Sequence, residues 1–485
     1  MDNSELKRSA ITGAVWKFLE RIGAQAVSLV VSIVLARMLT PDDYSVVGIV
    51  SIFFVFCNVF ISGGFNLALI RKKDADMLDY SSVLYVSLAV ALVLYGILAF
   101  AAPAIAQIYE KPILTPVFRV MGLALIINSI KSVVCAHISN NLQFRKFFFA
   151  TLSGTVTSAV VGISLAYYGF GPWALVAQNM TNSLIDTIIL FATTKFRPLL
   201  AISWKKVKDL FSYGWKLFVA SIITVAYDEA CPLIIGLRFS GADLAFYTKG
   251  RSYPAMLNSS INGTLSAVLF PVMSKVQEDT AAVCSYTRRF IRVASFVIFP
   301  MMVGFLAVSD TFISLLLTDK WLPAAQYIKI FCISYMFGII QDGNLQAIRA
   351  IGRSDIILKL EVIKKTMYAI ILVAAVLLFD RPEILAATVL ANTAIATVVN
   401  TAPNRKLIGY RLDQQLQDII PNLSISAVMG AIVYGMNYLP IPPIWLLLLQ
   451  ISTGALIYVG INLLIKNPDL KYVWQMLLQL IRKKK

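Results

Sequence analysis

Histidine and paired cysteines are scarce in this sequence, and each scarcity excludes a kind of chemistry. His137 is the only histidine, so Ser-His-Asp catalysis and histidine-based metal sites have almost no material. The five cysteines are scattered and include no Cys-x-x-Cys pair, which argues against a disulfide framework or a structural zinc site. We therefore expect neither a metal site nor a cofactor.

Charge is scarce too, because only 14% of the 485 residues are charged whereas 58% are hydrophobic. The mean hydropathy of +0.75 lies far above the value of a soluble globular chain. Apolar residues occur in blocks of about 20 to 27, the length that a helix needs to cross about 30 Å of hydrocarbon, whereas barrel strands would be half as long and alternating. The sequence thus predicts an all-α integral membrane protein.

Fourteen blocks are long enough to be transmembrane helices, and no soluble domain fits between them. They lie near residues 13–39, 45–70, 82–106, 117–137, 147–169, 172–194, 211–237, 247–274, 291–317, 325–349, 356–379, 383–402, 420–438 and 443–465. The first block follows a short charged leader, but it is too long for the apolar region of a signal peptide and lacks a small-residue cleavage site. We expect it to remain as the first span.

The formal net charge of +17 would suit a nucleic-acid-binding protein, but the distribution of the charge favours a membrane protein. If the amino terminus is cytoplasmic, most lysines and arginines fall in cytoplasmic joints. The opposite joints hold few of them: Arg37, Lys111, Arg238, Lys249, Lys320 and Arg381. This asymmetry predicts an even number of spans with both termini in the cytoplasm. The lipid bilayer, and not nucleic acid, is the expected partner of the basic residues.

The two halves of the chain resemble one another at an offset near 200 residues. The segment AVWKFL (14–19) recurs as YGWKLF (213–218), and LARMLTPDDYSVVG (35–48) is echoed by GLRFSGADLAFYTKG (236–250). Each unit holds six spans, and an even number restores the starting side, so the repeat would be parallel about a pseudo-twofold axis along the membrane normal. The alternative is a chance similarity between two helix starts.

This repeat predicts four parts in the chain. They are a six-helix bundle over 1–196, a cytoplasmic amphipathic linker over 197–210, a second six-helix bundle over 211–404, and two additional transmembrane helices with a basic cytoplasmic tail over 405–485. The linker has apolar residues among lysines, which is typical of an interfacial helix, although a lysine-rich loop also fits.

The first predicted span carries Lys17, Glu20 and Arg21 on one helical face. If these three charged side chains faced lipid, their transfer into hydrocarbon would cost roughly 8 to 10 kcal/mol. They must therefore face water or a partner. Glu20 can neutralise one of the two cations within the helix and leaves one positive charge over. The second half repeats the pattern with Lys216 in the place of Lys17.

We infer a hydrated cavity between the two bundles, with a cationic floor of Lys17, Arg21 and Lys216. Cations in a low-dielectric cleft attract anions, and phosphates above all. The alternative is that the charges of the first span lie near the cytoplasmic interface and snorkel, without contact to a substrate.

Carboxylates in such a cavity are candidates for proton or sodium coupling, because a buried carboxylate can exchange a proton as access alternates. The candidates are Glu20, Asp186, Asp228, Glu229 and Asp342. Structural ion pairs are the alternative role for carboxylates of this kind.

The stretch over residues 35–74 resembles the signature opening of the Wzx-type O-antigen and capsule flippases. These belong to the polysaccharide transporter branch of the multidrug/oligosaccharidyl-lipid/polysaccharide (MOP) exporter superfamily, which includes the MATE transporters. The resemblance rests on Trp16-Lys17, the Leu-Thr-Pro-Asp-Asp-Tyr turn, the Gly63-Gly64-Phe65 step and Asp79-Tyr80, and on fourteen spans in two related bundles.

The resemblance implies a protein that carries an undecaprenyl-diphosphate-linked oligosaccharide across a bacterial cytoplasmic membrane by alternating access. By position, Lys17, Arg21, Lys216 and Arg251 match a cationic lumen, and Arg37 and Arg238 would lie at its external mouth. A polysaccharide polymerase and chain-length machinery are the further partners it implies. The acidic pair Asp228-Glu229 matches no motif of the family.

Two other functions compete with that of a flippase. A MATE-like, ion-coupled drug antiporter would have an acidic or aromatic pocket, and the excess of lysine and arginine argues against it. An O-antigen polymerase or ligase would need a long external loop to hold the reacting sugars, and no external joint exceeds about 15 residues. The sequence therefore favours a transporter and not an enzyme.

Overall fold

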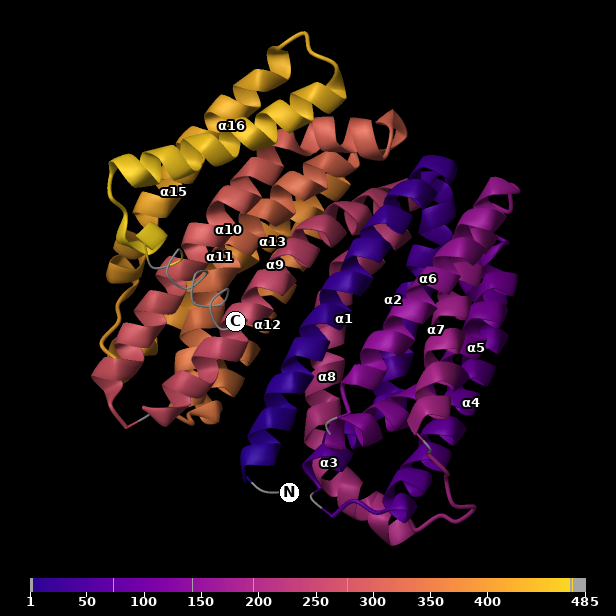
Figure 1. The fold of residues 1–485 in the computed structure, drawn as a ribbon. Helices are drawn as coiled ribbons and strands as arrows, with labels where there is room; N and C mark the ends of the chain where they lie inside the picture. Colours follow the sequence, from indigo (N-terminus) through magenta and orange to yellow (C-terminus); the bar gives the residue numbers. More distant parts are fainter. Residues whose placement is uncertain are drawn as a thin grey trace. The chain divides into compact units, whose positions relative to one another are not determined.

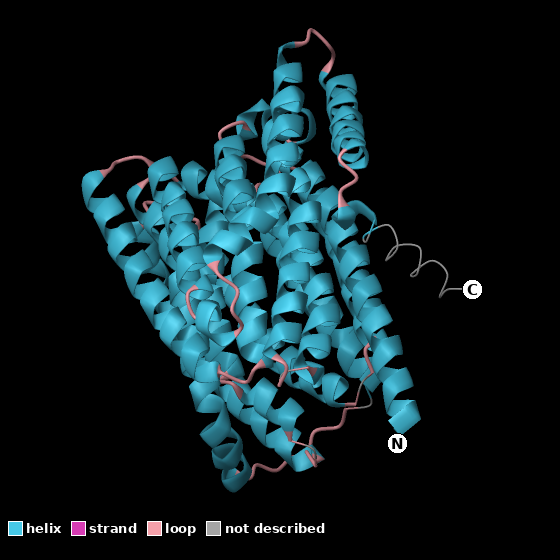
Figure 2. Ribbon diagram, turned by 90° about the vertical axis from the view of Figure 1, so that its left-hand side faces the viewer, coloured by secondary structure: helices cyan, strands magenta, loops and turns pink. Residues whose placement is uncertain are grey.

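The computed structural model describes residues 3–72, 74–141, 143–194, 196–276, 278–471 and 473, and within these residues the regular structure is entirely helical. Figure 2 shows long helices joined by short loops. The chain divides into two compact units, Met1–Ala245 and Phe246–Lys485.

The first unit, drawn from indigo to magenta in Figure 1, contains seven long helices and one short one. They are α1 (Asn3–Met38), α2 (Pro41–Ser62), the short α3 (Phe65–Arg71), α4 (Met77–Ile108), α5 (Leu114–Asn140), α6 (Arg145–Tyr167), α7 (Pro172–Thr194) and α8 (Trp204–Arg238). The helix α9 (Gly241–Lys275) begins in this unit and continues into the next.

The second unit continues from α9 to the end of the described chain. It holds α10 (Thr280–Leu316), the 3₁₀ turn η1 (Asp319–Trp321), α11 (Ala324–Ala350), α12 (Ser354–Leu378), α13 (Pro382–Thr401), the short α14 (Asn404–Leu407), α15 (Leu412–Gly435), the 3₁₀ turn η2 (Met436–Tyr438) and α16 (Pro443–Leu464).

Fourteen helices of twenty residues or more lie within the described residues, one for each predicted block. Ten of them are long and apolar enough to cross a membrane, so the chain is a multi-pass membrane protein. The other four, α7, α9, α11 and α12, are not among these ten, and their crossing of the membrane stays a prediction.

The predicted block over 45–70 is wrong in its outline, because the structure divides it into α2 and α3. Gly63 and Gly64 end α2 with φ angles of 48° and 74°, a conformation that favours glycine. A Cβ atom on Gly64 would lie 2.2 Å from the carbonyl oxygen of Gly214 in α8. The two glycines thus break the helix and let its end approach the backbone of α8.

The connection from α1 to α2 and the connection from α8 to α9 are built in the same way. The amide N–H of Thr40 donates to Asp43 at 2.8 Å, and the amide N–H of Asp43 donates to the Thr40 hydroxyl at 3.2 Å. Ser240 and Asp243 form the same reciprocal pair at 3.1 and 3.2 Å. The residue numbers differ by 200, the offset that the predicted repeat has.

The predicted interfacial linker over 197–210 is part loop and part helix in the structure. Residues 197–203 form no helix, and α8 runs without a break from Trp204. The amide N–H groups of Leu199 and Ser203 donate to the hydroxyls of Ser81 and Ser82 at 2.8 and 2.9 Å. The loop is therefore fixed to the start of α4, and α8 belongs to the first unit. The predicted domain boundaries at 196, 210 and 404 stay predictions.

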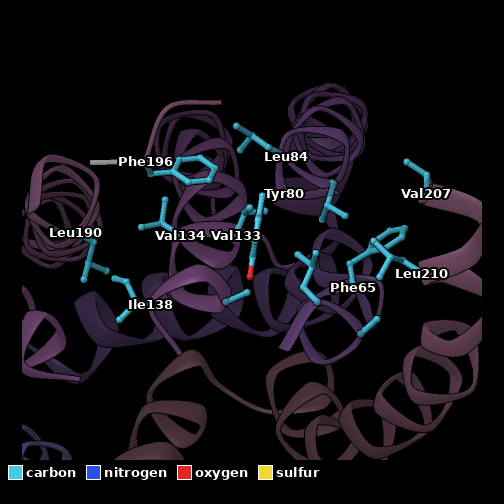
Figure 3. Close-up of a cluster of buried hydrophobic side chains, with 14 of the residues drawn as sticks. Phe65, Tyr80, Leu84, Val133, Val134, Ile138, Leu190, Phe196, Val207 and Leu210 are labelled. Atoms are coloured by element: carbon cyan, nitrogen blue, oxygen red, sulfur yellow. The ribbon is translucent and has the colours of Figure 1, made fainter. Parts of the chain in front are cut away.

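A buried apolar cluster joins the helices of the first unit at this end (Figure 3). Phe65 of α3, Tyr80 of α4, Val134 of α5 and Leu190 of α7 meet Leu210 of α8 in it. The predicted amphipathic pattern of the linker thus has a packing role, because Leu210 is buried in the cluster and not laid on a lipid surface.

The two carboxy-terminal long helices, α15 and α16, pack against α10 in the second unit. The Tyr458 hydroxyl donates to the carbonyl of Phe296 at 2.8 Å, and the Asn422 amide donates to the Ser295 hydroxyl at 3.0 Å. Polar contacts of this kind join helices inside a membrane.

Candidate functional site

At Trp16 and Glu20, the helix α1 lies against α6. Trp16 contacts Phe148 with ring centroids 5.3 Å apart, and the Arg145 guanidinium lies 5.4 Å from the centroid of the Trp16 ring. One turn further along, Glu20 accepts a hydrogen bond from the Thr151 hydroxyl at 3.3 Å. The predicted polar face of the first span is thus turned toward protein at Glu20.

The two cations of the same face are placed differently. The Arg21 side chain is exposed, whereas the side chain of Lys17 lies outside the described part of the structure. Lys216 is also exposed, on α8, two residues after the glycine that α3 approaches. The substrate-binding role of these cations stays a prediction.

The remaining predicted cations lie at helix ends or in the second unit. Arg37 and Arg238 are exposed in the last turns of α1 and α8, and the Arg238 guanidinium lies 6.0 Å from the centroid of the Phe239 ring. Arg251 is half-buried on α9. The structure therefore places all of the predicted cations in the first unit except Arg251.

The predicted coupling residue Asp186 is part of an ion pair inside the first unit. Its carboxylate lies 2.5 Å from the Lys131 ammonium of α5, and its side chain is only 7% exposed. The pair lies where α6 and α7 approach closely, because a Cβ atom on Gly154 would be 3.3 Å from the Cβ atom of Asp186. Nearby, the Asn128 amide donates to Asn58 of α2 at 3.4 Å.

The predicted coupling residue Asp342 has a different environment in the second unit. Its carboxylate accepts a hydrogen bond from Asn262 of α9 at 2.9 Å, and Asn262 also donates to Asn258 at 3.1 Å. Among the described ion pairs, none includes Asp342, and the nearby Lys364 is bound to Glu361 at 2.6 Å. Asp342 is thus held by the neutral amide of Asn262 while cations lie close.

The acidic pair of α8 is less enclosed than Asp186 and Asp342. Asp228 is exposed and Glu229 is half-buried, both in the middle of a helix that can cross a membrane. Their coupling role stays a prediction.

An ionic cluster that the sequence reasoning missed joins the starts of α4 and α8. The fully buried Asp79 carboxylate lies 2.7 Å from the Lys72 ammonium and 3.7 Å from the Lys206 ammonium. Lys206 also binds Asp76, the N-cap of α4, and this contact lowers the pKa of Asp76 from 3.8 to about 2. The Asp-x-x-Asp spacing of a capping box before an apolar run is the signal that could have revealed Asp76 and Asp79.

The comparisons with known proteins agree with this membrane architecture. The family model described as "Polysaccharide biosynthesis protein" matches residues 34–326. The teichuronic acid biosynthesis protein TuaB of Bacillus subtilis (strain 168) is 24% identical over 93% of this chain and 95% of its own. The lipopolysaccharide biosynthesis protein WzxC of Escherichia coli (strain K12) is 22% identical over 75% of this chain and 74% of its own.

Solved structures show the same fold. The lipid II flippase MurJ, in an inward closed conformation, superposes with a TM-score of 0.71 at 15% identity over 94% of this chain and 99% of its own. An inward-facing MATE family multidrug resistance transporter of the MOP superfamily superposes with a TM-score of 0.62 at 14% identity, over 80% of this chain and 94% of its own. These likenesses confirm the predicted MOP-type, all-helical membrane fold.

The family match covers more than half of the chain and includes the stretch over 35–74 on which the predicted resemblance depended. The chain accordingly belongs to the family of polysaccharide biosynthesis proteins.

Proposed function

We propose that this protein is a flippase for undecaprenyl-diphosphate-linked oligosaccharide repeat units, which it carries across the bacterial cytoplasmic membrane by alternating access. The product would serve the synthesis of a cell-surface polysaccharide such as O-antigen, capsule or exopolysaccharide. The family match over 34–326 is the observation that carries this proposal. The protein is a transporter and not an enzyme.

The physical task fits a helical membrane protein with polar groups in its interior. A diphosphate headgroup crosses hydrocarbon slowly because its charges would lose their hydration there. Polar helices such as α7 and α11 can replace part of that hydration without any covalent chemistry. In this proposal Lys17, Arg21, Lys216 and Arg251 receive the diphosphate, and Arg37 and Arg238 lie at the external mouth.

Orientation and energy supply complete the proposal. The charge asymmetry of the joints supports an inner-membrane protein with both termini in the cytoplasm. The candidates for proton or sodium coupling are Glu20, Asp186, Asp228, Glu229 and Asp342. A polysaccharide polymerase and its chain-length machinery are proposed partners that would take over the delivered repeat unit.

The test compares single cation removals in a host that lacks the chromosomal copy. Arg21→Ala and Lys216→Ala should each lower surface polysaccharide roughly tenfold, because each removes a charged contact to phosphate. Lys208→Ala, which removes an exposed cation from the start of the same helix as Lys216, should leave surface polysaccharide unchanged. Extracted surface polymer and the amount of protein in the membrane are the two measurements.

Wild-type amounts of polymer in both lumen variants would move Arg21 and Lys216 to the interfacial, snorkelling role. Wild-type amounts of polymer in the host without any copy of the gene would overturn the flippase proposal itself.

A MATE-like, ion-coupled drug antiporter is the second candidate function, and the fold of the multidrug resistance transporter favours it. In that case the host without the gene would retain its polysaccharide and become more sensitive to cationic drugs. The flippase proposal predicts instead that the host without the gene loses its surface polysaccharide and does not become more sensitive to cationic drugs.

A further inference from the structure

A cavity of about 350 Å³ lies in the second unit, at the end of α10 and at the joint between α15 and α16. These three helices pack together, as Figure 1 shows. The volume is at the low end for small-molecule sites, so the cavity suits one part of a larger ligand. Residues from α10, η1, α15, η2 and α16 line it: Asp310, Thr311, Ser314, Asp319, Leu322, Tyr434, Asn437, Tyr438, Pro443 and Leu446.

One wall of the cavity is rigid because the Asn437 side chain makes three hydrogen bonds. Its oxygen accepts hydrogen bonds from Thr311 at 3.0 Å and from Gln450 at 2.8 Å, and its nitrogen donates to the carbonyl of Ala307 at 3.1 Å. These bonds tie α10, η2 and α16 together around the cavity. A site held in this way is formed before a ligand arrives.

Two carboxylates supply acceptors to the cavity. Oδ2 of Asp310 is bound to the Lys329 ammonium at 2.7 Å, and Oδ1 of Asp319 accepts from the Ser314 hydroxyl. In each carboxylate the other oxygen can accept a hydrogen bond from a further donor. Among the ion pairs of the described residues, Lys329 pairs with Asp310 and none includes Asp319, so the lining carries an excess negative charge at Asp319.

Two tyrosine rings supply an apolar surface beside these acceptors. Tyr434 and Tyr438 pack edge to face with ring centroids 6.4 Å apart, and they are 44% and 79% exposed. Such exposed aromatic rings, rigid and amphipathic, are suited to ligand contact. A pyranose ring combines an apolar C–H face, which packs on aromatic rings, with hydroxyl groups, which donate to carboxylates.

The loop that carries Asp319 is strained. Thr318 has φ 86° and ψ 162°, a region that almost only glycine occupies and that costs about 1 to 3 kcal/mol for other residues. The fully buried Trp321 anchors the other end of the same turn. Packing thus holds Asp319 at the cavity against a backbone cost, which is typical of binding sites.

We infer that this cavity binds one neutral or N-acetylated hexose of the transported oligosaccharide on the external side of the membrane. The inference rests on the proposed function and on the proposed orientation, which places the end of α10 opposite the termini. The excess negative charge at Asp319 disfavours uronic acids, so the site would also contribute to sugar selectivity.

The test uses a cysteine placed in the cavity of the full-length protein in nanodiscs. Leu322→Cys lines the cavity and leaves the tyrosines and carboxylates in place, whereas Ile444→Cys is exposed on α16 outside the lining. We expect glucose, galactose or N-acetylglucosamine to slow maleimide labelling of Leu322→Cys and to leave Ile444→Cys unaffected. Glucuronate should protect least.

Two second-site changes connect this protection to the lining. Asp319→Asn should weaken saccharide protection of Leu322→Cys roughly tenfold, because it removes a charge-assisted hydrogen bond. Tyr438→Ala should weaken it as well, and this largely exposed residue can be changed without disturbing the packed core. In intact spheroplasts, an impermeant maleimide should reach Leu322→Cys, as the external location requires.

Several outcomes would overturn the inference. They are equal labelling with and without every saccharide, protection by calcium alone, protection by glucuronate equal to that by glucose, or no labelling from outside. Loss of surface polysaccharide in the host without the gene, together with no saccharide protection, would defeat this inference and leave the proposed function standing. Intact polysaccharide in that host, together with saccharide protection, would defeat the proposed function and the assignment of the hexose to a transported oligosaccharide, while the saccharide site itself would stand.

Discussion

At the scale of single residues, the structure depends on positions where a side chain would not fit or would lose its partner. Gly64 is such a position, because its left-handed φ of 74° and its approach to Gly214 both require the absence of a Cβ atom. The sequence showed the Gly63-Gly64 pair but not what it approaches. The partner is about 150 positions further along the chain, so only the tertiary fold reveals the contact.

Gly64→Ala should destabilise the protein strongly. The backbone conformation alone costs about 1 to 3 kcal/mol for a non-glycine residue, and the methyl group must also displace the Gly214 carbonyl. Gly96→Ala is the matched control, because a Cβ atom there meets no atom within 4 Å. Thermal unfolding of the purified protein in detergent measures both, and an unfolding temperature of Gly64→Ala at or above that of the control would contradict the contact.

At the scale of elements, sequence patterning predicted the helices well and their ends less well. Block lengths located all fourteen long helices, because hydrocarbon thickness fixes the length of an apolar run. The linker was harder to predict, since Val207 and Leu210 have the same amphipathic pattern whether they face lipid or a protein core. The buried cluster shows that they face the core, while Lys206 binds the N-cap of α4.

The contact between Lys206 and Asp76 should make stability depend on pH. The pKa of Asp76 is lowered to about 2, so its contribution is present above pH 4 and is lost as pH falls toward 2. Because the pair is partly exposed, the contribution is about 1 kcal/mol or less. Lys206→Ala should lower the unfolding temperature slightly at pH 7. Between pH 5 and pH 3, the unfolding temperature of this variant should fall by less than that of the wild type.

Lys205→Ala is the control for this experiment, because it removes an exposed lysine from the same turn of α8. Its unfolding temperature should follow the wild type at each pH. Equal acid sensitivity of the wild type and Lys206→Ala would show that the contact does not stabilise the start of α8.

At the scale of the whole molecule, sequence reasoning predicted the membrane class, the fold and the family but not which charges are paired. Periodicity shows which residues share a helical face, yet the partner of Asp186 is on another helix, 55 positions earlier in the chain. The division at residue 245 was also not predicted, because a repeat in the sequence does not show that α8 packs on α2, α3 and α4. The cavity of the second unit is lined by α10, η1, α15, η2 and α16, which no local motif connects.

These different pairings separate the candidates for the proposed proton or sodium coupling. A carboxylate bound to a lysine already has its counter-ion, as Asp186 has in Lys131. Asp342 is held by the Asn262 amide and is therefore the carboxylate better placed to exchange a proton. Asp342→Asn keeps the shape of the side chain and fixes it in the neutral state.

In proteoliposomes, Asp342→Asn should abolish the dependence of lipid-linked oligosaccharide transport on an imposed proton gradient while the unfolding temperature stays near that of the wild type. Asp186→Asn should instead lower the unfolding temperature, because it leaves the Lys131 ammonium without its carboxylate. Breaking a fully buried pair costs up to about 3 to 5 kcal/mol of folding free energy. The cost is smaller here, since the Lys131 side chain is one-third exposed. The reverse result, with gradient dependence lost in Asp186→Asn and retained in Asp342→Asn, would assign coupling to the ion pair. The two isosteric changes thus test the proposed coupling at each carboxylate, because gradient dependence reports on proton exchange and the unfolding temperature reports on the stability of the fold.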